Sequence, residues 1–280
     1  MEHVRWRTRP ELERPVLIAA FEGWNDAGDA ASSAVRYLVE RNDAELVADI
    51  DPEEFLDFTS SRPQARVGDD GERVIDWPSI DVYAGKLPGG AGDALLLLGS
   101  EPQLKWRTFC EQVVGIAREL DCRLALTLGA LIAEVPHSRP VPVVGTVGDA
   151  ALQAELGLPV STYAGPTGIV GVVSAAMRDA GVPTASLWAA VPTYVSNAPS
   201  PKAALALLGR VAEVLGTSLP TTDLEIAAAS YERQVSELVE EDDETSNYVS
   251  RLESRHDDGQ DMSGTSLADE VERYLRRRLD

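Results

Sequence analysis

The fold class follows from the run Val16-Leu17-Ile18-Ala19-Ala20-Phe21 and from residues 26–50, which come soon after it. Six consecutive apolar residues are typical of a strand that is buried on both faces. Residues 26–40 then carry apolar side chains at helical spacing, with Asp26 as the candidate N-cap, and residues 44–50 form the next predicted strand. This order predicts a β-α-β unit, whose connection is right-handed if its two strands are parallel.

The alternation of short apolar runs with longer helical patterns continues along the chain. Further strands are predicted at 93–99, 123–128, 141–147, 160–164 and 184–191, and helices at 106–120, 169–180 and 201–215. Residues 51–92 interrupt this order with two short strand candidates, at 72–77 and 80–84, and are expected to form an antiparallel excursion or an insertion. The predicted fold class is α/β: a three-layer sandwich around a mixed, largely parallel sheet, with additional C-terminal helices.

Composition excludes several classes of partner. The 280 residues include 25 Lys and Arg against 46 Asp and Glu, a formal net charge of −21. Such a chain has no general footprint for nucleic acid or for an anionic membrane, and its apolar runs, such as 16–21, 94–98 and 124–128, are too short to cross a bilayer. Two cysteines, Cys110 and Cys122, exclude a disulfide scaffold. We expect a cytoplasmic protein that binds neither nucleic acid nor membrane.

The C-terminal part of the chain differs in composition from the rest. Between Glu232 and Asp261 there are eleven acidic residues and three arginines. We predict an α/β core domain over 1–222 and an acidic helical region over 223–280, with a linker near 256–265 and a last amphipathic helix over 266–279. The acidic run is most simply a solvated helix face, although it could favour basic partners, and the last helix could pack on a neighbouring subunit.

Three loops follow predicted strands, and ligands of open α/β folds bind where parallel strands end. Glu22 and Glu101 are the candidate catalytic acids or bases in these loops. Asn25 would orient a polar ligand, and the amides near Thr167 would hold an anion. The ligand-binding candidates are Gly23, Trp24, Asn25, Asp26, Gly165, Thr167 and Gly168. Each loop could equally be a tight strand-to-helix turn with a structural role.

Other catalytic and cofactor motifs do not occur. The sequence holds no GxxxxGK[ST], GxGxxG or GxSxG motif and no CxxC pair, and its three histidines are far apart. No metal and no cofactor is therefore predicted. His137 is the only histidine in the middle of the chain, and it is interpreted as a turn residue rather than as a catalytic base.

Three motifs together resemble the proteasome assembly chaperone two (PAC2) family. They are Phe21 to Ala31, Gly165 to Gly171, and Ser186 to Val195 with the following Pro199 to Ala203. The segments 128–131 and 136–142, Glu101-Pro102 with Lys105-Trp106, and the acidic tail are similar to the actinobacterial branch. The resemblance covers roughly residues 12–255, with the order and spacing of the motifs intact. Thr193 stands where bacterial relatives often carry histidine.

The resemblance implies a fold related to the purine nucleoside phosphorylases and a homotrimer, but no established reaction. Eukaryotic members of the family help to assemble the proteasome α-ring. This chain ends Arg278-Leu279-Asp280, which does not fit the hydrophobic–Tyr–any ending of many proteasome binders. The leading hypothesis is a non-enzymatic, homo-oligomeric protein-binding or assembly factor. The alternative is a small-molecule-binding protein or an enzyme of phosphorylase/hydrolase-like type that uses a pocket at the strand-end loops.

Overall fold

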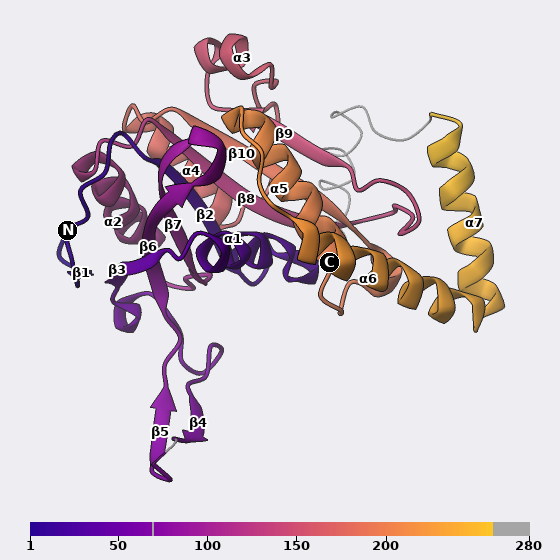
Figure 1. Ribbon diagram of the computed structural model, residues 1–280, viewed down its shortest axis with the longest axis horizontal. Helices are drawn as coiled ribbons and strands as arrows, with labels where there is room; N and C mark the ends of the chain where they lie inside the picture. Colours follow the sequence, from indigo (N-terminus) through magenta and orange to yellow (C-terminus); the bar gives the residue numbers. More distant parts are fainter. Residues whose placement is uncertain (69, 260–280) are drawn as a thin grey trace.

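A mixed eight-stranded sheet forms the centre of the molecule (Figure 1). The structure is a computed structural model that describes residues 1–68 and 70–259. In spatial order the strands are β1 (Val4–Trp6), β3 (Glu45–Ile50), β6 (Ile80–Leu87), β7 (Gly92–Ser100), β2 (Val16–Glu22), β8 (Leu124–Ala133), β10 (Thr184–Pro192) and β9 (Val143–Val147). The four strands β7, β2, β8 and β10 are parallel to one another, whereas β1, β6 and β9 run antiparallel to their neighbours. The prediction of a mixed, largely parallel sheet is confirmed.

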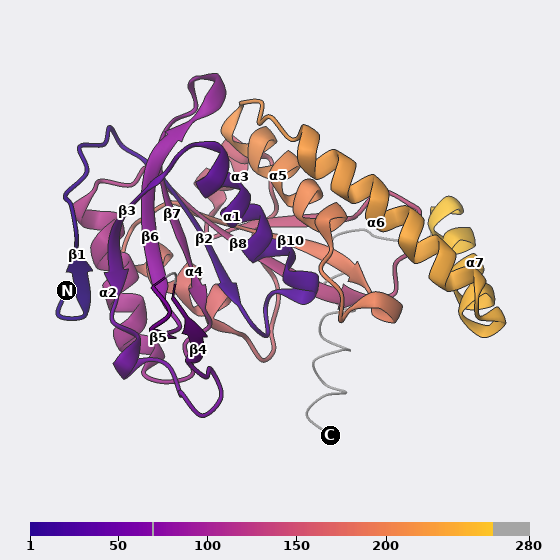
Figure 2. The same ribbon diagram turned by 60° about the horizontal axis from the view of Figure 1, so that its bottom comes forward.

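Helices cover both faces of this sheet. Helices α1 (Ala30–Arg41) and α5 (Pro201–Leu215) pack side by side on one face, as Figure 2 shows, and α2 (Trp106–Glu119) and α4 (Ile169–Asp179) pack on the other. Strand β2 supplies both cores, because Val16, Ile18 and Ala20 face α1 whereas the alternate residues face α2 and α4. Burial of each large apolar side chain contributes about 1.5–3 kcal/mol. The predicted three-layer architecture is confirmed.

The excursion over residues 51–92 has two parts. Strands β4 (Gln64–Val67) and β5 (Arg73–Asp76) form a separate two-stranded hairpin that stands away from the body of the molecule (Figure 1). Strand β6 instead joins the main sheet, antiparallel to β3 and to β7. Short 3-10 turns precede and follow these strands, η2 (Pro52–Glu54) and η3 (Pro88–Gly90).

Three sequence-based expectations about the elements are wrong. The strand expected at 160–164 is reduced to a single bridge between Val160 and Val147. The short elements β1 and α3 (Ala150–Leu156) were not expected. Helix α1 begins at Ala30, not at Asp26, because Gly28 and Asp29 adopt positive φ angles of 58° and 48° and form the 3-10 turn η1 (Ala27–Asp29).

Two helices follow α5 and extend to the end of the described chain. Helix α6 (Thr222–Glu240) packs on α5, and α7 (Asp243–Asp257) turns away from it after a break at which Asp242 accepts a hydrogen bond from the Thr245 amide, at 2.9 Å. Helix α7 therefore occupies the first positions of the linker expected near 256–265. The helix expected over 266–279 and the arginines at 276–278 lie outside the described residues. Within residues 1–68 and 70–259, no helix combines the length and apolar character needed to cross a membrane.

The buried His137 connects the β8–β9 loop to the C-terminal helices. Tyr194, in the turn η4 (Thr193–Val195), contacts both the His137 backbone N–H, at 2.7 Å, and Nδ1, at 2.9 Å. Ser236 Oγ of α6 donates to the Glu232 carbonyl at 3.0 Å, so it accepts from Nε2–H, also at 3.0 Å, and Nδ1 of the neutral ring then accepts the Tyr194 proton. The Lys202 ammonium donates to the carbonyl of His137 and pairs with Glu232. His137 is a structural residue at this junction.

Candidate functional site

Glu101 joins the ends of three segments that are distant in sequence. It follows β7, its backbone N–H donates to the Glu22 carbonyl at 2.8 Å, and one carboxylate oxygen accepts from the Trp24 amide at 3.1 Å. The other oxygen accepts from Asn25 Nδ2 at 2.9 Å and from the Ile169 amide, at the start of α4, at 3.2 Å. The three predicted loops therefore meet at the carboxyl edge of the sheet, as parallel strand ends require.

The contacts of Glu101 affect the anion-binding site predicted at the amides near Thr167. The N-terminus of α4 was expected to bind an anion through backbone amides. The structure places the carboxylate of Glu101 on the first of those amides, Ile169 N. The Thr167 side chain remains exposed beside it. A protein carboxylate therefore already occupies part of the position proposed for a ligand anion.

Two glycines allow the loops to approach each other. A Cβ atom on Gly168 would lie 2.0 Å from Asn25 Nδ2 and 2.5 Å from Asn25 Oδ1. Gly23 adopts a φ of +131°, and a Cβ there would lie 3.2 Å from the Glu101 side chain. Both glycines are thus needed for the contact between the loop after β2 (residues 23–29, the first loop), Glu101 and α4.

Asp26 is a buried residue of the first loop, with 4% of its surface exposed. Its Oδ1 atom accepts from the amides of Ala31, at 2.6 Å, and Ser32, at 3.2 Å, so its carboxylate caps α1 across the intervening 3-10 turn. Burial raises the pKa of Asp26 to about 6. The side chain is therefore poised to change charge near neutral pH, although its hydrogen bonds give it a structural role.

Glu22 lies apart from this cluster. Its side chain is exposed and pairs with Arg36 of α1, at 2.7 Å. The two carboxylates that were the catalytic candidates thus have different partners: Glu22 binds a surface arginine, and Glu101 binds the loops. Neither arrangement brings the two carboxylates to one shared ligand.

A cavity of about 930 Å³ opens beside these loops. Its walls are the first loop, the ends of β8, β9 and β10, the segment 159–168 and one face of α4. Among the described residues that line it are all seven predicted ligand-binding candidates, Gly23, Trp24, Asn25, Asp26, Gly165, Thr167 and Gly168; Glu22 and Glu101 are not among them. The cavity is within the size range of small-molecule sites.

The floor of the cavity contains residues that the sequence analysis missed. Thr127, Ser186 and Thr146 lie in register on β8, β10 and β9, and form a row of hydroxyl groups across the sheet; Ser186 and Thr146 line the cavity, and Thr127 is buried next to Ser186. Thr127 Oγ1 and Ser186 Oγ are 2.6 Å apart, and Ser186 Oγ donates to Ser174 Oγ of α4 at 3.2 Å. Isolated Ser and Thr residues inside otherwise apolar strands were the available signal.

A tryptophan lies beside this row of hydroxyls. Trp188 pairs with Gly129 across β10 and β8, and a Cβ on Gly129 would lie 2.6 Å from the Trp188 ring. The absence of a side chain at Gly129 therefore lets the indole lie flat against the sheet. Trp24, 43% exposed, supplies a second indole to the cavity wall.

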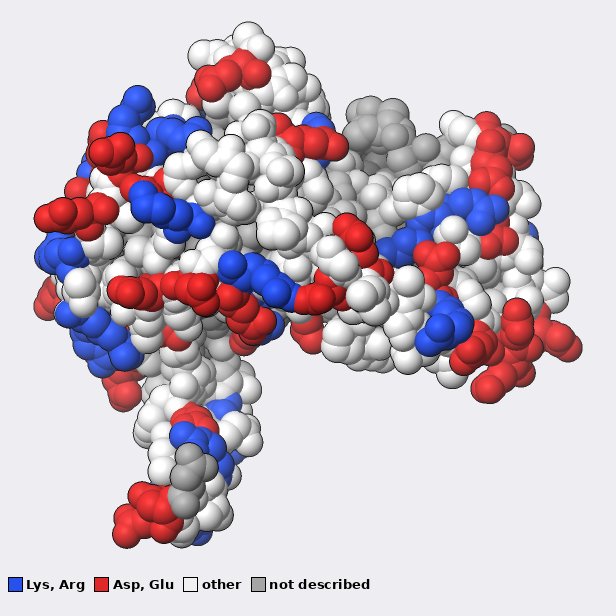
Figure 3. Space-filling model, viewed as in Figure 1, with Lys and Arg blue, Asp and Glu red and all other residues white. Residues whose placement is uncertain are grey.

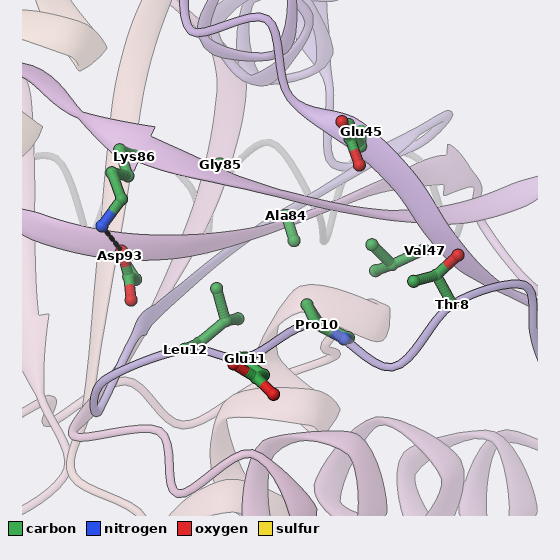
Figure 4. A pocket seen from close by; sticks show the side chains of 10 residues that line it. All are labelled: Thr8, Pro10, Glu11, Leu12, Glu45, Val47, Ala84, Gly85, Lys86 and Asp93. Carbon is green, nitrogen blue, oxygen red and sulfur yellow. Dashed lines mark hydrogen bonds and ion pairs between the residues drawn. The ribbon is translucent and has the colours of Figure 1, made fainter.

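A second, smaller pocket of about 280 Å³ lies at the opposite, amino edge of the parallel strands (Figure 4). Asp93 borders it and is buried, accepting from the Glu13 amide at 2.7 Å and from Lys86 at 3.0 Å. These bonds hold the pKa of Asp93 below its ordinary value. They fix the segment 8–15 against the sheet, so this pocket has a structural explanation.

Metal and thiol chemistry have little basis in the described residues. Within residues 1–68 and 70–259, no cluster of three or more His, Cys, Asp or Glu side chains could hold a metal ion. Burial raises the pKa of Cys110 to about 11 and that of Cys122 to about 12, so both thiols stay protonated at neutral pH.

On the face drawn in Figure 3, basic and acidic side chains are interspersed, and acidic residues gather at the α6–α7 turn.

The family model described as the PAC2 family matches residues 20–239. This chain belongs to the PAC2 family. A proteasome-assembly chaperone homologue from Mycobacterium tuberculosis is 44% identical, covering 84% of this chain and 99% of that chain with a TM-score of 0.76. A PAC2 family protein from Streptomyces avermitilis is 43% identical, with the same coverage and a TM-score of 0.77. No curated protein matches the chain.

Two further similarities extend the comparison. A Mycobacterium tuberculosis protein of unknown function is 30% identical, and the match covers 99% of this chain and 97% of that chain with a TM-score of 0.85. An archaeal homologue of proteasome-assembly chaperone from Pyrococcus furiosus is 17% identical over 90% of this chain and 99% of that chain, with a TM-score of 0.60. The archaeal likeness concerns the fold alone. The family predicted from the three motifs is confirmed.

Proposed function

We propose that this PAC2 family member is a non-enzymatic protein-binding or assembly factor that works as a cytoplasmic homo-oligomer, with a trimer as the expected state. The β4–β5 hairpin carries the proposal. Val67, Ile75 and Trp77 expose 68%, 48% and 57% of their surface, although large apolar side chains elsewhere in the described chain are mostly buried. An isolated two-stranded hairpin is at best marginally stable in water. A second protein surface over this arm would stabilise it.

Most of the apolar side chains of the hairpin lie on one face. Ala65 pairs with Ile75, and Val67 pairs with Arg73, so Ala65, Val67 and Ile75 share a face with Arg73 by alternation, whereas Val74 lies on the other face. We assign this face to contact with another copy of the chain. Because one relative is a proteasome-assembly chaperone homologue, we also propose a proteasome-related partner. That partner would bind the assembled oligomer, whereas the arm contacts another copy of the chain.

The test is the mass of the full chain in solution by light scattering, for the natural sequence and for Ile75→Lys. The natural chain should give a multiple of 30.1 kDa, and Ile75→Lys should lower the mass toward the monomer because it places a charge in the apolar contact. Val74→Lys, on the other face of the same strand, is the matched control and should keep the oligomer. A natural chain that stays monomeric at every concentration would refute the homo-oligomer, and an unchanged mass for Ile75→Lys would refute the arm contact.

The cavity supports a second candidate function, the binding of a small molecule. Its size and its position at the strand ends are those of a ligand site in an α/β fold. Because Glu22 and Glu101 are held outside it, binding has more support than acid–base catalysis. A soaked crystal or ligand-detected NMR with a metabolite mixture tests this candidate. A change in tryptophan fluorescence reports occupancy, because Trp24 and Trp188 line the cavity.

A further inference from the structure

The charged groups that line the cavity already have partners or face water. The Asp26 carboxylate accepts from two helix amides, and the Arg178 guanidinium pairs with the Asp179 carboxylate at 2.8 Å. Asp29 is exposed at the start of α1. Removing an ionised ligand from water requires an unpaired counter-charge inside the site. The lining therefore favours an uncharged ligand.

Hydroxyl groups supply most of the polar lining. They come from three sides: Thr146 and Ser186 on the sheet, Ser174 on α4, and Ser161, Thr162 and Thr167 on the covering segment. Each hydroxyl offers one donor and two acceptor positions. In the linked set of Thr127, Ser186 and Ser174, the two bonds given above use two of the three protons. One donor and several acceptor positions therefore remain for a ligand that both donates and accepts.

Flat apolar surface lies next to these hydroxyls. Trp188 is two residues beyond Ser186 on the same face of β10, and its ring lies against Gly129. Indole rings give large contact area with one polar N–H edge. A ligand that fits both features has hydroxyl groups around its rim and an apolar ring face. The cavity, at about 930 Å³, has room for more than one such ring.

We propose that the cavity binds a neutral sugar of two or three rings, with its hydroxyl groups on Ser186, Ser174 and Thr146, and a ring face on Trp188. This proposal rests on the second candidate function, the binding of a small molecule. It names the class of ligand from the chemistry of the floor and assigns the binding role to residues of β9, β10 and α4.

The experiment uses the full chain with maltose, cellobiose and sucrose as probes, and with benzoate and inorganic phosphate as charged comparisons. Tryptophan fluorescence and saturation-transfer NMR report binding. At least one disaccharide should bind saturably, and Ser186→Ala should weaken it roughly tenfold through lost hydrogen bonds. Ser218→Ala, in the exposed α5–α6 loop, is the matched control and should bind as the natural chain does.

A second variant covers the case in which Ser186→Ala does not fold. Thr146→Val keeps the shape of the side chain on the edge strand β9 and removes its hydroxyl group, and it should also weaken disaccharide binding. Saturable binding of benzoate or phosphate without any sugar would overturn the sugar assignment and leave the ligand-binding candidate standing. Failure of every probe to change either signal would count against both. Sugar binding unchanged in both hydroxyl variants would overturn the role of the floor.

Discussion

The amide of Asn25 lies directly against the α-carbon of Gly168, so closely that a Cβ at position 168 would be 2.0 Å from Asn25 Nδ2. This contact joins the loop after β2 to the start of α4. The carboxylate of Glu101 accepts hydrogen bonds from both of these segments. The mouth of the cavity is therefore a packed joint of three segments.

Gly168→Ala should destabilise the protein, because the added methyl group must displace Asn25 from Glu101. Overpacking of this kind costs about 1–3 kcal/mol in the free energy of unfolding. Urea unfolding measures the change. Gly209→Ala is the matched control, since no described atom lies within 4 Å of a Cβ on that α5 residue. The control should be neutral or more stable by about 0.5–1 kcal/mol, as for Gly to Ala in a helix; equal losses in both variants would contradict the packing argument.

Glu101→Gln should also destabilise the joint. The carboxylate accepts three hydrogen bonds, from Trp24 N, Asn25 Nδ2 and Ile169 N, and an amide side chain can accept on only one of its two terminal atoms. If the amide oxygen keeps the bonds from Asn25 Nδ2 and Ile169 N, the new NH2 group faces the exposed Trp24 amide, and the loss of that bond costs about 1 kcal/mol. The measurement is the unfolding free energy, with the exposed Glu111→Gln in α2 as the control. A catalytic acid with no structural role would instead tolerate the change without loss of stability.

Asp26 should give the stability a pH dependence between about 4 and 6. Its pKa is raised from 3.8 to about 6 by burial, so the folded state binds a proton more tightly than the unfolded state. The resulting stabilisation is complete below pH 4 and is lost as the pH rises through 6. Carboxyl chemical shifts should give a midpoint near 6, and Asp26→Asn should remove this component from the pH profile. A midpoint near 4 would show that the carboxylate is not desolvated.

His137 should contribute with the opposite sign. Burial, and then the nearby Lys202 ammonium, lower its pKa, so the unfolded state binds the proton more tightly. Its contribution is present above pH 6.5 and is lost as the pH falls through the lowered folded value. Imidazole resonances should keep their neutral shifts below pH 6.5, with the exposed imidazole of a short peptide as the reference. A charged imidazole at pH 6.5 would contradict the bonding described for Tyr194 and Ser236.

The sequence predicted the layers and the central strands because their signal is local. The run Val16 to Phe21 is apolar at every position, which only a strand buried on both faces requires. The strand predicted at 160–164 is wrong. Its β-forming residues lie between Pro159 and Pro166, and only one bridge to β9 forms. The site residues were found as loop residues, but the partners of Glu101 were not, because those bonds connect positions 24, 25 and 169 across the fold.

The row Thr127, Ser186 and Thr146 was missed for a related reason. Each lies among apolar residues of its strand, and only the register of β8, β10 and β9 places the three hydroxyls side by side. Strand order is not encoded locally, since β10 lies between β8 and β9, two strands that follow each other in the sequence. A polar residue in a buried strand is thus a signal whose meaning appears only after the sheet is assembled.

The carboxylate of Glu101 also has a consequence for the order in which the molecule folds. Its partners lie at positions 24, 25 and 169, so the joint closes chain loops of more than a hundred residues in total. Contacts of such sequence separation cost more loop-closure entropy than the local contacts within helices, and they form after them. During refolding, helical circular dichroism should therefore recover before Trp24 reaches its native emission, and the mouth of the cavity should be among the last regions to become ordered.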